Sequence, residues 1–444
     1  MRNFPFLLLM LLLLAAAGLF AQEDTLRLTL AEAQLRAIER GPAYQISLLD
    51  RRLAEEELAL ARLRLYPQVD LALDARYYFE RPPTLLPGEA VGRPGEVAVV
   101  QLGGNIGGAP VLDLRQVVFD PTLFSELKIL REAGATAELQ IEVEARNLKL
   151  QVAKSYVTLL AARERQAQLR QTARRLESTL EQVRAKVSAG LLPALEEERV
   201  LLTLEQNRAE TSQAAEALEM SELLLKQLLG VPPDRPIALT QPFEPEEDPA
   251  GLPVSPVDLS RLPEYRLGER QVRLIELESA LQRRAVWPRV SLYSQLGVVA
   301  LGKKVDNEGE DQLSWYFNSF VGLKAVWEIN RLVSNGHRLD QLELERRQAE
   351  WRWTGQEDQL ALAAARAGYQ FRAALETLRL QRRRAAFAEN ELIYLQTRFQ
   401  SDLAGVREVL EAEEALSAAQ RAVQVAYYDC WAVKFELLSL RDEL

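Results

Sequence analysis

Hydrophobic and polar residues alternate in a stretch that follows a proline, from Val69 to Phe79. Its odd positions are Val, Leu, Leu, Ala, Tyr and Phe, whereas its even positions are Asp, Ala, Asp, Arg and Tyr. A period of two is typical of a β-strand with one apolar and one polar face. The same switch, an aromatic residue and a proline followed by alternation, recurs at Trp287-Pro288. The chain therefore contains one structural unit twice.

Four two-faced strands are predicted, and each repeat supplies a pair of them. They cover about residues 68–79, 111–119, 290–299 and 320–329. Their apolar faces carry Val69, Leu71, Leu73, Leu292, Leu296 and Leu323. Aromatic residues stand at the strand ends, namely Tyr77, Phe79 and Trp327. The Pro- and Gly-rich segment between the first two strands, and the polar segment between the last two, are predicted to be loops.

Each strand pair is followed by a long helical hairpin. Residues 122–189 contain no proline and one glycine, and their apolar residues recur at helical spacing. At about 1.5 Å per residue, such a helix would be about 100 Å long, which no globular domain accommodates. Gly190 and Pro193 mark a turn into a return helix. The sequence thus predicts antiparallel coiled-coil hairpins at 122–229 and 332–440.

The repeats define the domain organisation. Residues 22–230 form the first repeat, 231–262 a proline-rich irregular connector, and 263–444 the second repeat. The first repeat opens with a capping box at Thr29 and Glu32, and Gly41-Pro42 interrupts its first helix. Residues 1–21 combine Arg2 with an apolar run and a small residue, as in a cleaved secretory signal; a membrane anchor is the alternative.

The composition narrows the possible functions. With 27% charged and 7% aromatic residues among 444, the chain fits long helices better than a compact enzyme. A net charge of −10 argues against a nucleic-acid partner. After residue 21 no run of about 18 apolar residues occurs, so a membrane crossing would need strands. Four strands cannot close a barrel, and open sheet edges are not tolerated in lipid; several chains would therefore have to pool their strands.

Catalytic chemistry finds little support in the sequence. The single histidine, His337, has no second histidine or cysteine with which to share a metal, and Cys430 is the lone cysteine. A di-iron helical-bundle enzyme would need two Glu-x-x-His pairs. The glycine-rich segment 103–108 lacks the Lys-Ser/Thr of a phosphate-binding loop, so we interpret it as an ordinary loop. We predict no metal, no cofactor and no enzyme activity. The basic run 382–384 is a solvated helix face or an adaptor contact.

Several short motifs, in order and duplicated, resemble the TolC family of outer-membrane efflux proteins over essentially the whole chain after the leader. They are Leu28-Thr29-Leu30-Ala31-Glu32-Ala33, Gly41-Pro42, both aromatic-Pro-x-Val switches, Tyr156-Val157-Thr158-Leu159-Leu160, and Ala189-Gly190-Leu191 followed by Leu195-Glu196. The resemblance implies a mixed, mostly α fold, and a homotrimer whose strands form one 12-stranded barrel in the outer membrane. It implies helices that form a tunnel through the periplasm.

That resemblance also implies a function. The trimer would be the passive exit duct of a tripartite efflux or type I secretion system, with a periplasmic adaptor and an inner-membrane pump of RND or ABC type as partners. Outer-membrane lipid would surround the barrel. The alternative is a soluble periplasmic coiled-coil adaptor, which would share the helical hairpins but not the two-faced strands. The sequence leaves the cargo open among drugs, metal cations and polypeptides.

One stretch resembles the constricted periplasmic mouth of the family. Residues 406–411 read Val-Arg-Glu-Val-Leu-Glu, similar to a family stretch with two aspartates, so Glu408 and Glu411 stand where those aspartates stand. Residues three apart share a helix face, and repetition about a threefold axis would make two acidic rings. Glu196 is the counterpart in the first repeat. The alternative is a solvated carboxylate pair. Phe399 and Ala404 replace polar residues that tie the closed mouth in some members.

Overall fold

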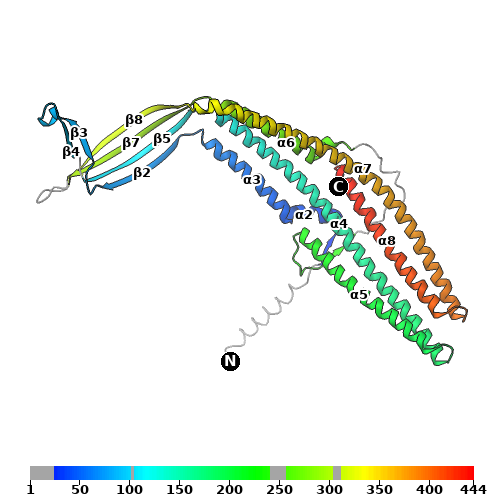
Figure 1. Cartoon of the computed structure of the whole chain (residues 1–444). Helices are drawn as coiled ribbons and strands as arrows, with labels where there is room; N and C mark the ends of the chain where they lie inside the picture. The colour runs from blue at the N-terminus through cyan, green and yellow to red at the C-terminus, as the bar shows by residue number, and fades with distance from the viewer. Residues whose placement is uncertain (1–24, 102–104, 241–256, 304–311) are drawn as a thin grey trace, which may run out of the picture. The chain divides into compact units, whose positions relative to one another are not determined.

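The computed structural model describes residues 25–101, 105–240, 257–303 and 312–444 (Figure 1). The predicted signal peptide lies outside these ranges. The chain divides into two compact units. A helical unit comprises the residues up to Asp50, Ala137–Glu269 and Arg352–Leu444, and a second unit comprises Arg51–Thr136 and Arg270–Trp351 and contains the large sheet.

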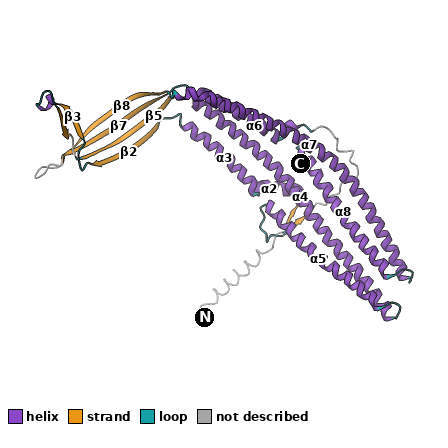
Figure 2. Cartoon of the chain, viewed as in Figure 1, coloured by secondary structure: helices purple, strands orange, loops and turns teal. Residues whose placement is uncertain are grey.

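Helices account for most of the described chain (Figure 2). They are α2 (Leu30–Arg40), α3 (Pro42–Leu63), α4 (Pro121–Ser188), α5 (Ala194–Leu228), α6 (Pro263–Arg284), α7 (Asn330–Gln400) and α8 (Val406–Leu440). Both predicted hairpins are present: α4 has 68 residues and α7 has 71. No helix in the described part of the chain holds an apolar stretch long enough to cross a membrane.

The helix ends follow from local chemistry. The capping box is confirmed, because the backbone N–H of Glu32 donates to the Thr29 hydroxyl and the Glu32 carboxylate accepts from the Thr29 N–H. Asp120 caps α4 by accepting from the Thr122 N–H at 2.9 Å. Gly190 adopts a positive φ of 75° in the turn that follows α4, a backbone conformation that favours glycine.

Four antiparallel strands form the large sheet in the order β2-β5-β7-β8. They are β2 (Gln68–Tyr77), β5 (Ile106–Phe119), β7 (Arg289–Lys303) and β8 (Gln312–Val326). At the ends far from the helices, the predicted bounds were too short for β5, β7 and β8, whereas β2 ends at Tyr77, two residues before its predicted end. Residues 106–108, interpreted as part of a glycine-rich loop, belong to β5. Strand β8 begins at Gln312 rather than at residue 320, because three consecutive aromatic residues at 315–317 conceal its alternation in the sequence, and it ends at Val326, before Trp327.

Two segments that were predicted to be irregular contain short strands, which form two small sheets. The Pro- and Gly-rich segment after β2 contains a hairpin of β3 (Pro83–Pro87) and β4 (Val97–Gln101), closed by the short helix η1 (Gly88–Val91). The connector contains β6 (Ile237–Leu239), which pairs in parallel with β1 (Leu26–Leu28), and the short helix η3 (Leu259–Arg261). Strands of three to five residues are too short for periodicity to identify them.

The helical unit has its main core beside the β1–β6 pair. Tyr156 is fully buried there, and its hydroxyl donates to the Leu28 carbonyl oxygen at 2.9 Å. Ala33 and Ala37 of α2, also fully buried, pack in the same cluster with Trp431 of α8. A second cluster lies near the far ends of the hairpins and joins α4, α5, α7 and α8. The two hairpins are thus packed on one another at both levels.

Candidate functional site

Strand register gathers the predicted lipid-facing residues on one face of the sheet. Leu71 lies opposite Leu112, which lies opposite Leu296, so one rung carries three leucines. Val69, Leu71, Leu73, Leu296 and Leu323 are all exposed, Leu73 by 78%, and Leu292 is half-buried. An exposed row of aliphatic side chains across several strands is rare in soluble monomers, which seldom present large contiguous apolar patches.

Aromatic residues lie at the end of this face that is far from the helices. Tyr77 packs edge-to-face against Phe79, with ring centroids 5.3 Å apart. Trp315 and Phe317 belong to the same face of β8 by register and are exposed, but the sequence analysis missed them because it began this strand at residue 320. Trp327 lies just beyond β8, where its indole N–H donates to the Val286 carbonyl oxygen at 3.0 Å.

The opposite face of the sheet is polar and hollowed. Asp70 lies opposite Asp113, and the amide of Gln295 donates to Asp113 at 3.0 Å. Both carboxylates line a hollow of about 890 Å³ together with Arg115 and Tyr293. Leucines on one face and charges on the other match the needs of a sheet between lipid and water.

At the far end of the hairpins, one lysine ties the turn after α4 to the turn after α7. Nζ of Lys186 donates to the Phe399 carbonyl oxygen at 2.6 Å and pairs with Asp402 at 2.5 Å. It also lies 4.2 Å from the centroid of the Phe399 ring. Asp402 has a positive φ of 58° in the second turn. The sequence analysis did not identify this tie, because the two residues are more than 200 positions apart.

Candidate gate residues lie beside these turns. Glu408 is exposed in the first turn of α8, and its carboxylate accepts from the Gly405 N–H at 3.4 Å. Glu411 is exposed one turn later and pairs with Arg407 at 3.0 Å. Glu196, half-buried in the first turn of α5, pairs with Arg199 at 3.4 Å. Each hairpin therefore presents a carboxylate at the start of its return helix.

A buried ion pair lies beneath this surface. Nε of Arg175 in α4 donates to Glu413 in α8 at 2.9 Å, and its Nη2 lies 2.5 Å from the same carboxylate. The Glu413 side chain is only 5% exposed. The sequence held a signal for the burial of Glu413 but not for its partner, because Glu413 falls at a heptad position in line with the buried Val409 and Leu416. The pair joins α4 of the first hairpin to α8 of the second and so sets how the two hairpins are aligned along their length.

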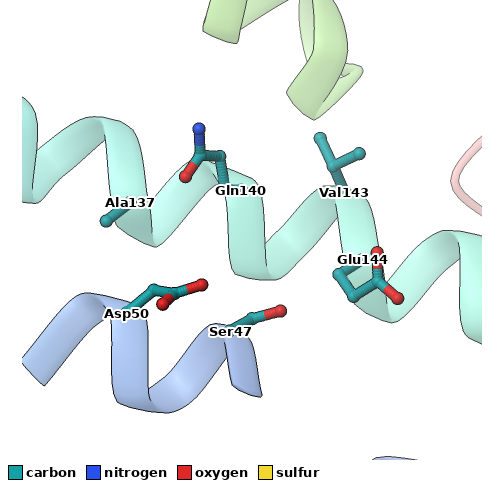
Figure 3. Close-up of a pocket in the computed structure, with 6 residues that line it drawn as sticks. All are labelled: Ser47, Asp50, Ala137, Gln140, Val143 and Glu144. Atoms are coloured by element: carbon teal, nitrogen blue, oxygen red, sulfur yellow. The ribbon is translucent and has the colours of Figure 1, made fainter. Parts of the chain in front are cut away.

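The described residues include further polar features away from the sheet and the turns. A shallow pocket of about 230 Å³ separates Ser47 and Asp50 of α3 from Gln140 and Glu144 of α4 (Figure 3). Nowhere in the described ranges do three or more histidine, cysteine or acidic side chains gather as metal ligands would. His337 and residues 382–384 are exposed, and burial raises the pKa of the Cys430 thiol to about 11.

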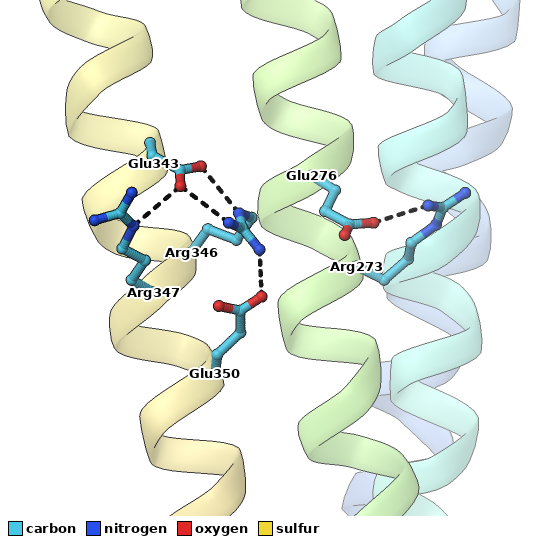
Figure 4. A network of polar contacts seen from close by, with 6 residues as sticks. All are labelled: Arg273, Glu276, Glu343, Arg346, Arg347 and Glu350. Carbon is cyan, nitrogen blue, oxygen red and sulfur yellow. Dashed lines mark hydrogen bonds and ion pairs between the residues drawn. The ribbon is translucent and has the colours of Figure 1, made fainter.

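A charged network surrounds Glu343 on α7 (Figure 4). Its carboxylate accepts from Arg346 at 2.9 Å and from Arg347 at 3.1 Å, and Arg346 also pairs with Glu350. These hydrogen bonds, first those from Arg346, lower the pKa of Glu343 to about 2. The network stabilises the helix surface through pairs three and four residues apart.

Comparison with known proteins finds similarity in structure and none in sequence families. No protein-family model matches the chain, and no curated relative does. The CmeC outer membrane channel of Campylobacter jejuni matches with a TM-score of 0.72 at 14% identity, over 94% of this chain and 86% of CmeC. The chain has the fold of outer-membrane channels. The outer-membrane channel OprN matches with a TM-score of 0.70 at 17% identity, over 93% of this chain and 89% of OprN.

The outer membrane protein VceC of Vibrio cholerae matches with the same TM-score of 0.70, at 17% identity, over 93% of this chain and 96% of VceC. This outer-membrane-channel fold confirms the mostly helical architecture with some strands that the sequence analysis expected.

Proposed function

We propose that this chain is one protomer of an outer-membrane exit duct. The duct is a passive channel for substrates that an inner-membrane pump drives into it, and a periplasmic adaptor is the other partner. The observation that carries the proposal is the sheet with one exposed apolar face and two edge strands, β2 and β8. In lipid, unpaired edge groups cost several kcal/mol each. Pairing of β8 with β2 of a neighbouring copy removes both edges, and three copies give twelve strands.

The strands have the length that this role requires. Strands β7 and β8 have 15 residues each. At about 3.3 Å per residue they extend about 50 Å, and a tilt of about 40° leaves about 38 Å along the membrane normal. The hydrocarbon core is about 30 Å thick, so both strands cross it and reach the interface. The exposed Trp315 and Tyr77 then lie where aromatic belts stand in such barrels.

Exposed apolar positions on the helices support assembly of several copies. On α3, Ile46, Leu49, Leu53 and Leu60 are each more than half exposed and recur at helical spacing. A second stripe on α7 carries Trp351, Leu362, Tyr369 and Phe387. These stripes lie on helices that are polar elsewhere, and contact between neighbouring protomers would bury them.

The test is assembly and conduction of the full-length protein. Extracted in detergent, it should be a stable oligomer by light scattering and should form discrete channels in planar bilayers. A folded monomer that keeps its full strand content, and that is water-soluble without detergent, would instead support the periplasmic adaptor. A stable oligomer without channel activity would contradict the duct but not the assembly.

Glu408, Glu411 and Glu196 are our candidates for the periplasmic gate. Repeated around the axis, exposed carboxylates at the helix starts would make the mouth attractive to cations. Replacing Glu408 and Glu411 by Gln keeps size and removes charge, so cation selectivity and block by multivalent cations should weaken without loss of assembly. The matched control is Glu376→Gln, which removes an exposed carboxylate paired with an arginine on α7. Unchanged selectivity would assign the pair to the solvated surface.

A further inference from the structure

The polar face of the sheet carries charges of opposite sign at neighbouring positions along β5. Asp113 and Arg115 are two residues apart on β5, so their side chains point to the same face at about 7 Å separation. Asp70 lies opposite Asp113 and reinforces the negative level. Throughout the described residues, neither Asp70 nor Arg115 has an ion-pair partner, and Asp113 is held by the neutral amide of Gln295.

Two aromatic rings form a wall beside these charges. Tyr293 of β7 and Phe320 of β8 pack edge-to-face with centroids 5.7 Å apart, on the polar face. A side chain at Gly322 would place its Cβ within 2.8 to 2.9 Å of the Tyr293 ring. The glycine therefore lets the Tyr293 ring lie flat on β8, away from β5.

The register relates the wall to the charges. Tyr293 lies opposite Arg115, and Gln295 lies between Asp113 and Phe320 on the adjacent rung. Arg115 therefore has the Tyr293 ring on the adjacent strand, about 5 Å away, and Asp113 has the Phe320 ring two strands away, about 10 Å across the sheet. Asp70, Asp113, Arg115 and Tyr293 line the same hollow of about 890 Å³. Its size is in the range of small-molecule sites.

We propose that this hollow is a weak subsite for aromatic zwitterions, small molecules with a cationic and an anionic group on either side of a ring. The cation would meet Asp70 and Asp113, the anion Arg115, and the aromatic ring of the ligand the ring of Tyr293, against which Phe320 packs edge-to-face. Since this face lines the lumen only if the chain forms the proposed duct, the inference rests on that function. It adds a substrate preference located in the barrel, separate from the mouth.

The experiment compares two zwitterions and one cation as blockers in planar bilayers containing the assembled full-length protein. 4-(Aminomethyl)benzoate has an aromatic ring between its charges, and 6-aminohexanoate has a chain. A ring contact contributes about 0.5–1.5 kcal/mol, so the aromatic probe should interrupt the current at about twofold to tenfold lower concentration. Benzylamine, which lacks the anion, should be weaker than the aromatic zwitterion.

Variants then test whether the rings of Tyr293 and Phe320 cause the stronger block by the aromatic zwitterion. Phe320→Leu and Gly322→Ala should each remove the difference in blocking concentration between the two zwitterions. Asp113→Asn should weaken the block by both zwitterions. Tyr316→Leu removes an exposed aromatic farther along the same face and should change nothing. Equal block by the two zwitterions in the wild type would overturn the subsite while leaving the duct intact. Discrimination that survives in Phe320→Leu and Gly322→Ala would also overturn it, whereas absence of channels would refute the duct itself.

Discussion

Lys186 should control how readily the hairpin ends separate. It is the residue that joins the turn after α4 to the turn after α7, through the Phe399 carbonyl, the Asp402 carboxylate and the Phe399 ring. Replacing it by Met keeps a long, unbranched side chain, one atom shorter, and removes every polar contact. If the proposed duct opens by separating these ends, the Lys186→Met channel should spend more time open.

The contacts differ in strength because their exposure differs. The Lys186 side chain is 18% exposed, so its charged hydrogen bond to a backbone carbonyl contributes about 1.5–3 kcal/mol. The Asp402 side chain is 71% exposed, and such an ion pair contributes at most about 1 kcal/mol. The ring contact adds about 0.5–1 kcal/mol. Lys186→Met should thus shift the open-to-closed ratio by at least about tenfold, and Asp402→Asn by about fivefold or less.

Single-channel recording checks both magnitudes. The matched control is Lys154→Met, because Lys154 also joins the two hairpins, by an ion pair between α4 and Glu436 of α8, but farther from the turns. If Lys154→Met raised the open time as much as Lys186→Met, the effect would come from general loosening of the hairpins. An unchanged open time in Lys186→Met would refute the reasoning and move the control of opening elsewhere.

Three further predictions follow from the sheet and the helices. Leu71→Arg should destabilise the membrane-inserted assembly by roughly 2–4 kcal/mol, whereas the Asp70→Arg protein should assemble with altered conductance. Oligomer yield measures the assembly, and an equal loss in both variants would mean that the two faces of the sheet are misassigned. Glu413→Ala should cost about 3–5 kcal/mol in urea unfolding because it leaves the Arg175 charge without its carboxylate, and replacing both residues by Leu should cost less. The pKa of Glu343 is lowered from 4.5 to about 2, so its stabilisation is present above pH 4.5 and is lost as pH falls to 2; the melting-temperature difference between wild type and Glu343→Gln should shrink over that window.

Local signals were sufficient to predict the types and order of the long elements. Helix ends depend on neighbouring residues, so the Thr29 capping box, the Asp120 cap and the Gly190 turn could be located from the sequence alone. A period of two over ten residues similarly identified β2 and the identity of its apolar face. The candidate gate residues Glu408 and Glu411 came from a resemblance in order and spacing, and their role stays a prediction.

Pairing between distant segments was decided only by the tertiary structure. Strands β1 and β6 are too short to show a period and exist because the chain brings residues 26 and 237 together. The Lys186–Asp402 tie and the Arg175–Glu413 pair likewise depend on how two hairpins pack, which no local pattern encodes. Strand register was also decided by the tertiary structure, and it places Tyr293 over Gly322 and Asp113 beside Gln295. Local sequence thus determines what each segment is, because periodicity and capping act over a few residues, whereas long-range packing determines which side chains meet.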